Sequence, residues 1–228
     1  MDVNPLIVIM AVRHFSTPFF YIQHLTEYDK LIVRNYSHEE AHNIVRTFFR
    51  EHKEYTHLFV WCEDIIATPD QALLLISDSM VHDFPVISGY VNWDLSHLWI
   101  NATKKDMRKT SVQFAENYDF LRILDVLHYP EGEPFLKVFF VGLPFTLIRR
   151  DVEEAASFTP YKYIQDKALG KLMKRGIMFD LQFCNECADK DIPINIDRRL
   201  FLFHYGNTVQ YIHLDKAVKS IQFIPRGI

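Results

Sequence analysis

The sequence predicts an α/β fold, with a single Rossmann-like domain, a mixed but mostly parallel sheet, and helices on both faces of that sheet. Two observations lead to this prediction. Short, fully apolar runs recur along the chain, and such runs are typical of strands that are covered on both faces. Segments with helical spacing alternate with them, which favours parallel strands joined by crossover helices. The length of 228 residues suits one domain.

The first ninety residues show the alternation most clearly. Apolar runs predict strands at residues 6–12, 31–33, 57–62 and 86–91. A short helix is expected after Thr17-Pro18, and a second one after Ser37-His-Glu-Glu40, which has the spacing of a capping box. Thr68-Pro69-x-Gln71 combines an N-cap, a proline in the first turn and a second capping box, so it predicts a helix that continues through residues 72–80.

The second half of the sequence is less regular. We expect strands at 97–103, 137–142, 194–196 and 200–203, an exposed loop at 104–109, and helices at 145–156 and 181–189. The last twenty residues alternate between apolar and polar side chains only in places. A closing strand, a helix packed on the domain and a lid therefore remain as alternatives. The whole chain, 1–228, is treated as one domain, with residues 207–228 as an appendage or lid.

Composition and charge narrow the classes of partner. The formal net charge is −4, so no basic face for nucleic acid is expected. The first apolar run is too short to span a bilayer, and we expect no transmembrane segment. Three cysteines suit a reducing compartment, so a cytoplasmic location is expected, with peripheral attachment to a membrane left open. Cys184-x-x-Cys187 has zinc or redox spacing, although a buried helix face is favoured because no second ligand pair is nearby.

The central chemical feature is a pair of adjacent acids, Glu63 and Asp64, where the third apolar run ends. Ligands of open α/β sheets bind outside the carboxyl ends of the strands. Oxygen ligands there suit Mg²⁺ or Mn²⁺, which can bridge a diphosphate. Neither a GxGxxG nor a GxxxxGK phosphate-binding loop is present. If the protein binds phosphates, another group must bind them, and a metal ion is the simplest candidate. The alternatives are a solvated turn, or Asp64 as a helix cap.

Residues 61–65, followed by Thr68-Pro69-Asp70, resemble the DXD region of the glycosyltransferase A fold, in members similar to family 2. The order of an apolar strand, acids, an aliphatic residue and a proline-led helix carries this resemblance. Cys62 stands where the first acid of a strict D-x-D would be. The resemblance implies that Asp64 holds Mn²⁺ or Mg²⁺ and that Glu63 contacts ribose or sugar hydroxyls.

Other segments follow in the matching order. By resemblance, Arg13 and Asn35 lie at the nucleotide, and both could equally be ordinary loop ends. Residues 88–93 resemble the strand and loop after the metal motif, with Trp93 stacking on a sugar ring or lying in the core. Residues 140–150 resemble the segment near the acceptor, where Gly142 permits close approach of the backbone.

Two late residues complete the resemblance. Phe179-Asp180-Leu-Gln-Phe-Cys is similar to a stretch that opens a helix near the acceptor, although Phe179 replaces the usual Glu. Asp180 would then be the general base in an inverting member. The alternative is that it is simply the N-cap of the helix, and both roles can hold at once. His204 resembles the histidine that completes the metal site in several members, with a half-buried strand histidine as the alternative.

The resemblance implies a metal-assisted glycosyltransferase that moves a sugar from a nucleoside diphosphate to an unknown acceptor, which is a glycan, a lipid or a protein. A non-catalytic protein that binds sugar nucleotides is one alternative. A nucleotidyltransferase is another, although it would usually carry a glycine-rich basic loop near the first strand. The interpretation requires that residues 63 and 64 face a pocket shared with residue 204.

Overall fold

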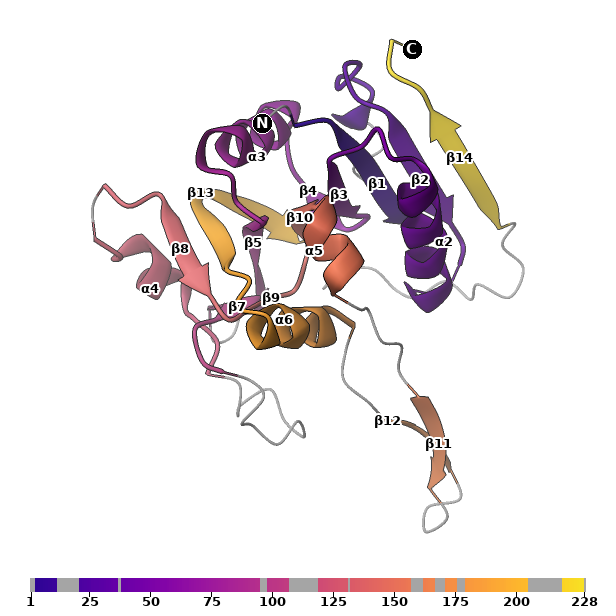
Figure 1. The fold of residues 1–228 in the computed structure, drawn as a ribbon. Coiled ribbons are helices and arrows are strands. Elements are labelled where there is room, and N and C mark those ends of the chain that lie inside the picture. Colours follow the sequence, from indigo (N-terminus) through magenta and orange to yellow (C-terminus); the bar gives the residue numbers. More distant parts are fainter. Residues whose placement is uncertain are drawn as a thin grey trace.

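The computed structural model describes residues 3–11, 21–36, 38–94, 98–106, 119–130, 132–156, 162–166, 171–175, 179–204 and 219–227. It shows a mixed α/β fold with one large sheet and helices on both faces (Figure 1). Arg13, the predicted helix start at Thr17-Pro18, the cap residue Ser37 and all of residues 207–218 lie outside the described residues.

Five strands of the large sheet run in one direction and form its frame. They are β1 (Pro5–Ala11), β2 (Lys30–Arg34), β3 (His57–Cys62), β5 (Val86–Asp94) and β13 (Ile194–His204). Strand β10 (Phe145–Arg149) lies antiparallel between β3 and β5 and joins the two groups. Among the described residues the order is β14-β2-β1-β3-β10-β5-β13-β4, with β6 paired to β5 and β8 to β13.

The remaining strands make the sheet more mixed than predicted. Four short strands each pair antiparallel with the frame: β4 (Ile65–Ile66), β6 (Trp99–Ile100), β8 (Phe135–Val138) and β14 (Ser220–Ile224). Two small sheets are not hydrogen-bonded to the large one. One pairs β7 (Ala102–Thr103) with β9 (Phe140–Val141), and the other pairs β11 (Lys162–Asp166) with β12 (Lys171–Arg175). The closing segment 207–228 therefore contributes a strand to the large sheet.

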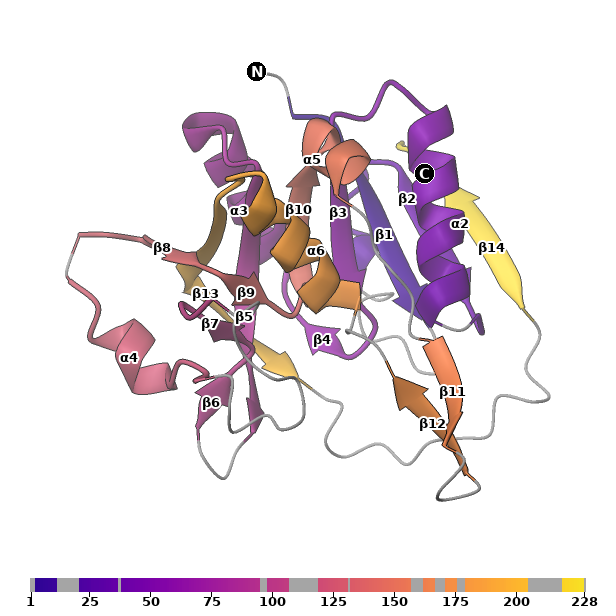
Figure 2. The ribbon, with the colours of Figure 1, turned by 60° about the horizontal axis from the view of Figure 1, so that its bottom comes forward.

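Helices cover both faces of the sheet (Figure 2). On one face lie α2 (His38–Glu51), α5 (Arg150–Ala155) and α6 (Phe179–Asp189), and on the other lies α3 (Pro69–His82). The short helix α4 (Ile123–Leu127) precedes β8. The capping box of α3 is confirmed, because the Gln71 amide donates to Thr68 Oγ1 and the Thr68 amide to Gln71 Oε1. No described helix has the length and apolar character needed to cross a membrane.

Several predicted elements are confirmed, among them the first four strands and the helix at 181–189, where Cys184 and Cys187 are both buried free thiols. The predicted helix at 145–156 is wrong in its first half. Residues 145–149 form β10, whose side chains are buried on both faces of the sheet: Phe145 and Leu147 in one core, Ile148 in the other. Burial on two faces suits a central strand, and only the last turns form α5.

Three further predictions needed correction. The predicted strand at 137–142 is divided into β8 and β9, which pair with different partners. The predicted strand at 97–103 is likewise two short strands, β6 and β7, within its described residues. Conversely, the two expected strands at 194–196 and 200–203 form the single strand β13, with an irregularity in pairing between Ile196 and Phe201.

A buried carboxylate fixes α5 against α2. The Glu153 side chain is fully buried and receives hydrogen bonds from Arg46 Nε at 2.6 Å and Arg50 Nε at 3.4 Å. Arg46 also donates to the Ala156 carbonyl oxygen at 3.1 Å. A buried charge of this kind is tolerated only while its partners remain in place.

We expect Glu153→Gln to lower the free energy of unfolding by about 3 kcal/mol, because it leaves the two guanidinium groups without their buried carboxylate. Urea denaturation monitored by circular dichroism would measure the loss. Glu154→Gln is the matched control, since the exposed pairs of Glu154 with Lys53 and Arg150 should contribute less than about 1 kcal/mol. Equal effects of the two substitutions would contradict the assignment.

Candidate active site at the carboxyl edge of the sheet

The topology gathers the described candidate residues at one edge of the sheet. Asn35 follows β2, Glu63 and Asp64 follow β3, and His204 ends β13, and all three strands run in the same direction. Because β10 runs the opposite way, the loop that precedes it also reaches this edge, and Gly142 lies in that loop. This is the edge at which open α/β sheets bind their ligands.

Asp64 and His204 are brought into contact by the short strand β4. Its two residues pair with the end of β13, so that Ile65 lies opposite His204. The indole Nε1 of Trp61 donates to the Ile65 carbonyl oxygen at 3.0 Å and holds the intervening turn. As a result, Asp64 Oδ2 lies 3.1 Å from His204 Nε2, across 140 positions of sequence.

The two facing atoms of this pair are a carboxylate oxygen and a ring nitrogen. Both offer lone pairs when Asp64 is ionised and the Nε2 position carries no hydrogen. The other ring nitrogen, Nδ1, is buried without a hydrogen-bond partner in the described part of the chain. Glu63, beside Asp64, is buried at 4% exposure. Across the described ranges, no three His, Cys, Asp or Glu side chains are arranged to hold a metal ion.

Cys62 connects the end of β3 to the loop before β10. Its thiol donates to the Leu143 carbonyl oxygen at 3.5 Å, and its backbone amide donates to the Pro144 carbonyl oxygen at 2.9 Å. Cys62, which stands where a strict D-x-D motif has its first acid, therefore has a structural role. It positions the Gly142 loop against the strand that carries the acids.

Asp180 reaches the same loop from the first turn of α6. Its Oδ1 accepts the Leu181 amide hydrogen at 2.8 Å. A Cβ atom on Gly142 would stand 3.7 Å from Asp180 Oδ2 and 3.2 Å from Asn101 Nδ2, so only glycine leaves this space open. Burial raises the pKa of the Asp180 carboxyl to about 6, against the opposing effect of its backbone hydrogen bonds. Asp180 lies inside the helix that begins at Phe179, and not at the N-cap position before it.

Two asparagines at this edge were not predicted. Asn101 links β5 to the Gly142 loop: its Oδ1 accepts from the Val91 amide at 2.9 Å, and its carbonyl oxygen accepts from the Gly142 amide at 3.0 Å. Asn92, the neighbour of Val91, is 8% exposed, and neither atom of its amide group has a partner among the described residues. In the sequence, the only sign of Asn92 as a site residue is that it is a polar residue directly after the apolar run 86–91.

The remaining candidates are placed less completely. Asn35 has a left-handed backbone, with φ of 61°, and its amide donates to the Ala11 carbonyl oxygen, so it lies where β1 and β2 end. Trp93 belongs to β5, although its side chain lies outside the described part of the structure.

Comparison with known proteins supports the fold alone. The crystal structure of A197 from STIV is similar, with a TM-score of 0.50 and 16% sequence identity over 92% of this chain and 98% of that chain. No family model matches the sequence, and no curated protein sequence matches it. The similarity to A197 shows a shared arrangement of strands and helices.

The pKa of Asp180 predicts a pH-dependent stability. Because the folded pKa of about 6 lies above the unfolded value, the proton bound in the folded state stabilises it below pH 4, and this contribution is lost as the pH rises through 6. Between pH 4 and pH 8, we expect wild type to lose about 2.4 kcal/mol relative to Asp180→Asn. Urea denaturation at pH 4, 6 and 8 would test this, with Asp70→Asn as the control for loss of an exposed carboxylate. Parallel curves for wild type and Asp180→Asn would show that burial leaves the carboxyl unperturbed.

Proposed function

We propose that this protein is a metal-assisted glycosyltransferase with a Rossmann-like core of the glycosyltransferase A type, which transfers a sugar from a nucleoside diphosphate to an acceptor hydroxyl. The contact between Asp64 and His204 carries the proposal. A strand-end acid and a histidine far away in sequence meet at the edge where open α/β sheets bind ligands, and this arrangement supports the proposal. The buried carboxyl of Asp180 at the Gly142 loop supplies the second group that the chemistry needs.

On the donor side, the chain offers a carboxylate oxygen and an imidazole nitrogen to Mn²⁺ or Mg²⁺. Two protein ligands suit such an ion, which commonly takes its other ligands from water and substrate phosphates. When bound, the ion would neutralise the charge that develops on the departing diphosphate. Glu63 would accept hydrogen bonds from ribose or sugar hydroxyls, and Asn35 lies where the nucleobase would reach the ends of β1 and β2.

On the acceptor side, Asp180 is suited to act as a general base. Its pKa of about 6 leaves the carboxylate ionised at neutral pH while keeping it basic enough to accept a proton. Because Gly142 has no side chain, an acceptor hydroxyl would approach Asp180 Oδ2 past its Cα atom. As the acceptor hydroxyl oxygen attacks the anomeric carbon, its proton would pass to Asp180 Oδ2. The diphosphate leaves with the electrons of the broken bond to the anomeric carbon. Such a single displacement inverts the anomeric centre.

The test is nucleoside diphosphate release from uridine, guanosine and cytidine diphosphate sugars, with and without Mn²⁺ or Mg²⁺. We expect turnover with one donor class that requires the ion. Asp64→Asn, His204→Gln and Asp180→Asn should each lower kcat/KM by about 100-fold or more, in keeping with the loss of a general base or of charge stabilisation. Asp70→Asn, which removes an exposed acid near Asp64 in sequence, should retain wild-type activity.

The outcomes separate the alternatives. Calorimetric binding of a sugar nucleotide without turnover would identify a non-catalytic binding protein at the same edge. Pyrophosphate release from a nucleoside triphosphate and a sugar phosphate would identify a nucleotidyltransferase. If none of the three nucleoside diphosphates binds, with or without the ion, the proposal is wrong.

A further inference from the structure

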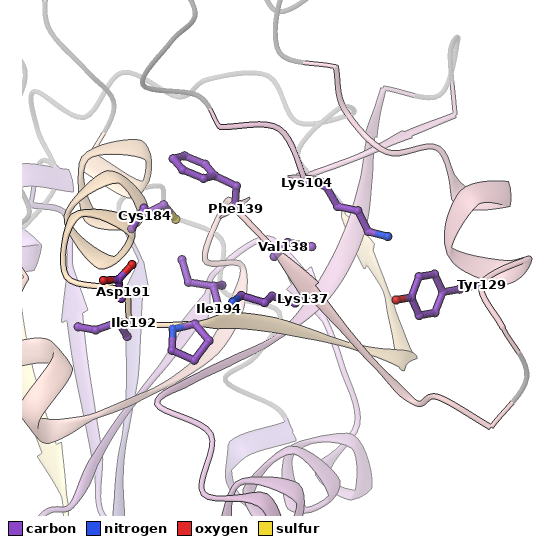
Figure 3. A pocket seen from close by; sticks show the side chains of 11 residues that line it. Lys104, Tyr129, Lys137, Val138, Phe139, Cys184, Asp191, Ile192 and Ile194 are labelled. Carbon is purple, nitrogen blue, oxygen red and sulfur yellow. The ribbon is translucent and has the colours of Figure 1, made fainter.

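A cleft of about 520 Å³ lies between β8, the chain that leaves α6 and the side chain of Tyr129 (Figure 3). It is distant from the Asp64–His204 pair. Ile194, the first residue of β13, lines the cleft, whereas His204 is the last residue of the same strand. Eleven residues of strand span about 30 Å, so the two places lie at opposite ends of β13.

Two lysines give the cleft a positive charge. Lys104 and Lys137 both line it, and neither has a carboxylate within ion-pairing distance in the described parts of the chain. The ammonium of Lys104 lies 4.4 Å from the centroid of the Tyr129 ring, and the same ring lies 5.3 Å from the Arg198 guanidinium carbon. The Arg198 N–H groups donate to backbone carbonyls and not to an acid.

The charge is distributed unevenly along the cleft. Asp191 lines the end of the cleft beside α6. Figure 3 shows Lys104 and Tyr129 at the opposite end, and Lys137 between these two ends. Asp191 follows the carboxyl end of α6, where the helix dipole is also negative. A negatively charged ligand group would therefore be repelled from the α6 end and attracted toward Lys104.

The wall between these ends is apolar. Phe139, Ile192 and Pro193 are half-buried and present apolar surface to the cleft, and Val138 and Ile194 lie almost fully buried beneath it. A purely hydrophilic anion would leave this surface in contact with water, whereas an apolar body would cover it. The volume is within the range of pockets that hold small organic molecules.

We propose that this cleft is a binding site for an organic anion, in which a phosphate or carboxylate group lies near Lys104 and Lys137 and an apolar body covers Phe139, Ile192 and Pro193. The site is independent of glycosyl transfer and would hold its ligand whether or not the proposed activity is correct. Its ligand is either a free amphiphilic metabolite or the headgroup and first chain segment of a membrane lipid, because both present the same chemistry.

Decyl phosphate is the probe for calorimetric titration, used below its micellar concentration. We expect it to bind at least tenfold more tightly than inorganic phosphate, which lacks the apolar body, and than decyltrimethylammonium, which has the opposite charge. Affinity should fall as salt is added. The double substitution Lys104→Gln/Lys137→Gln should weaken binding at least tenfold. Lys105→Gln, the matched control, removes a neighbouring lysine that lies outside the cleft and should change affinity less than twofold.

A second measurement does not depend on the variants. Methyl resonances of Val138, Ile192 and Ile194 in the wild-type protein should shift on addition of decyl phosphate, and those of the buried β1 residues Ile7 and Ile9 should not. Sedimentation with phosphatidylcholine vesicles containing phosphatidic acid then distinguishes the sources. Binding that requires Lys104 and Lys137 indicates a membrane lipid, and binding of decyl phosphate alone indicates a free metabolite. Equal affinity of the double variant and Lys105→Gln, equal binding of the alkylammonium, or unshifted cleft methyls would overturn the proposal.

Discussion

The antiparallel insertion of β10 is the constraint on which the rest of this fold depends. Thr146 pairs with Val60 of β3 on one side and with Ser88 of β5 on the other, so a single strand joins the two groups of parallel strands. Its side chains lie in the cores on both faces of the sheet. Because β10 runs against its neighbours, the loop that leads into it arrives where they end. The same strand thus holds the sheet together and places the loop that contains Gly142 against Cys62.

The contact between Asp64 and His204 also imposes a shape on the sheet. β3 and β13 are three places apart in the strand order, which in a flat sheet would separate them by about 14 Å. Residues 63 and 64 form a turn that keeps Cys62 and Ile65 within about 7 Å of each other, and Ile65 pairs with His204 about 5 Å away. The edge must therefore curl toward itself, and the irregular pairing of β13 after Ile196 is where its course can change. A curled edge produces the concave surface that a ligand needs.

Local patterns predicted the parts of the fold that local physics determines. The Thr68 capping box and the apolar runs at β1 and β3 carry their own signals, and the position of Glu63 and Asp64 follows from the end of a strand. β10 was misassigned because the apolar pattern of residues 145–149 suits a buried helix as well as a central strand. Pairing with β3 and β5, which the local pattern does not show, determines that the segment is a strand. The bridging role of Asn101 was also unpredictable, since its segment has no periodicity and its partners, Val91 and Gly142, are distant in sequence.

The pairing of β14 with β2 has a consequence for how the chain is made. β14 begins 186 residues after β2 ends, and it covers the outer edge of a strand whose centre, Leu31 to Val33, is wholly apolar. A ribosome needs roughly 10 to 40 seconds to synthesise that much chain. Throughout this interval the backbone groups along one side of β2 are open to any extended segment nearby. The nascent protein therefore passes through a stage in which a chaperone, or an identical chain on the same messenger RNA, competes for the place that its own last strand will occupy.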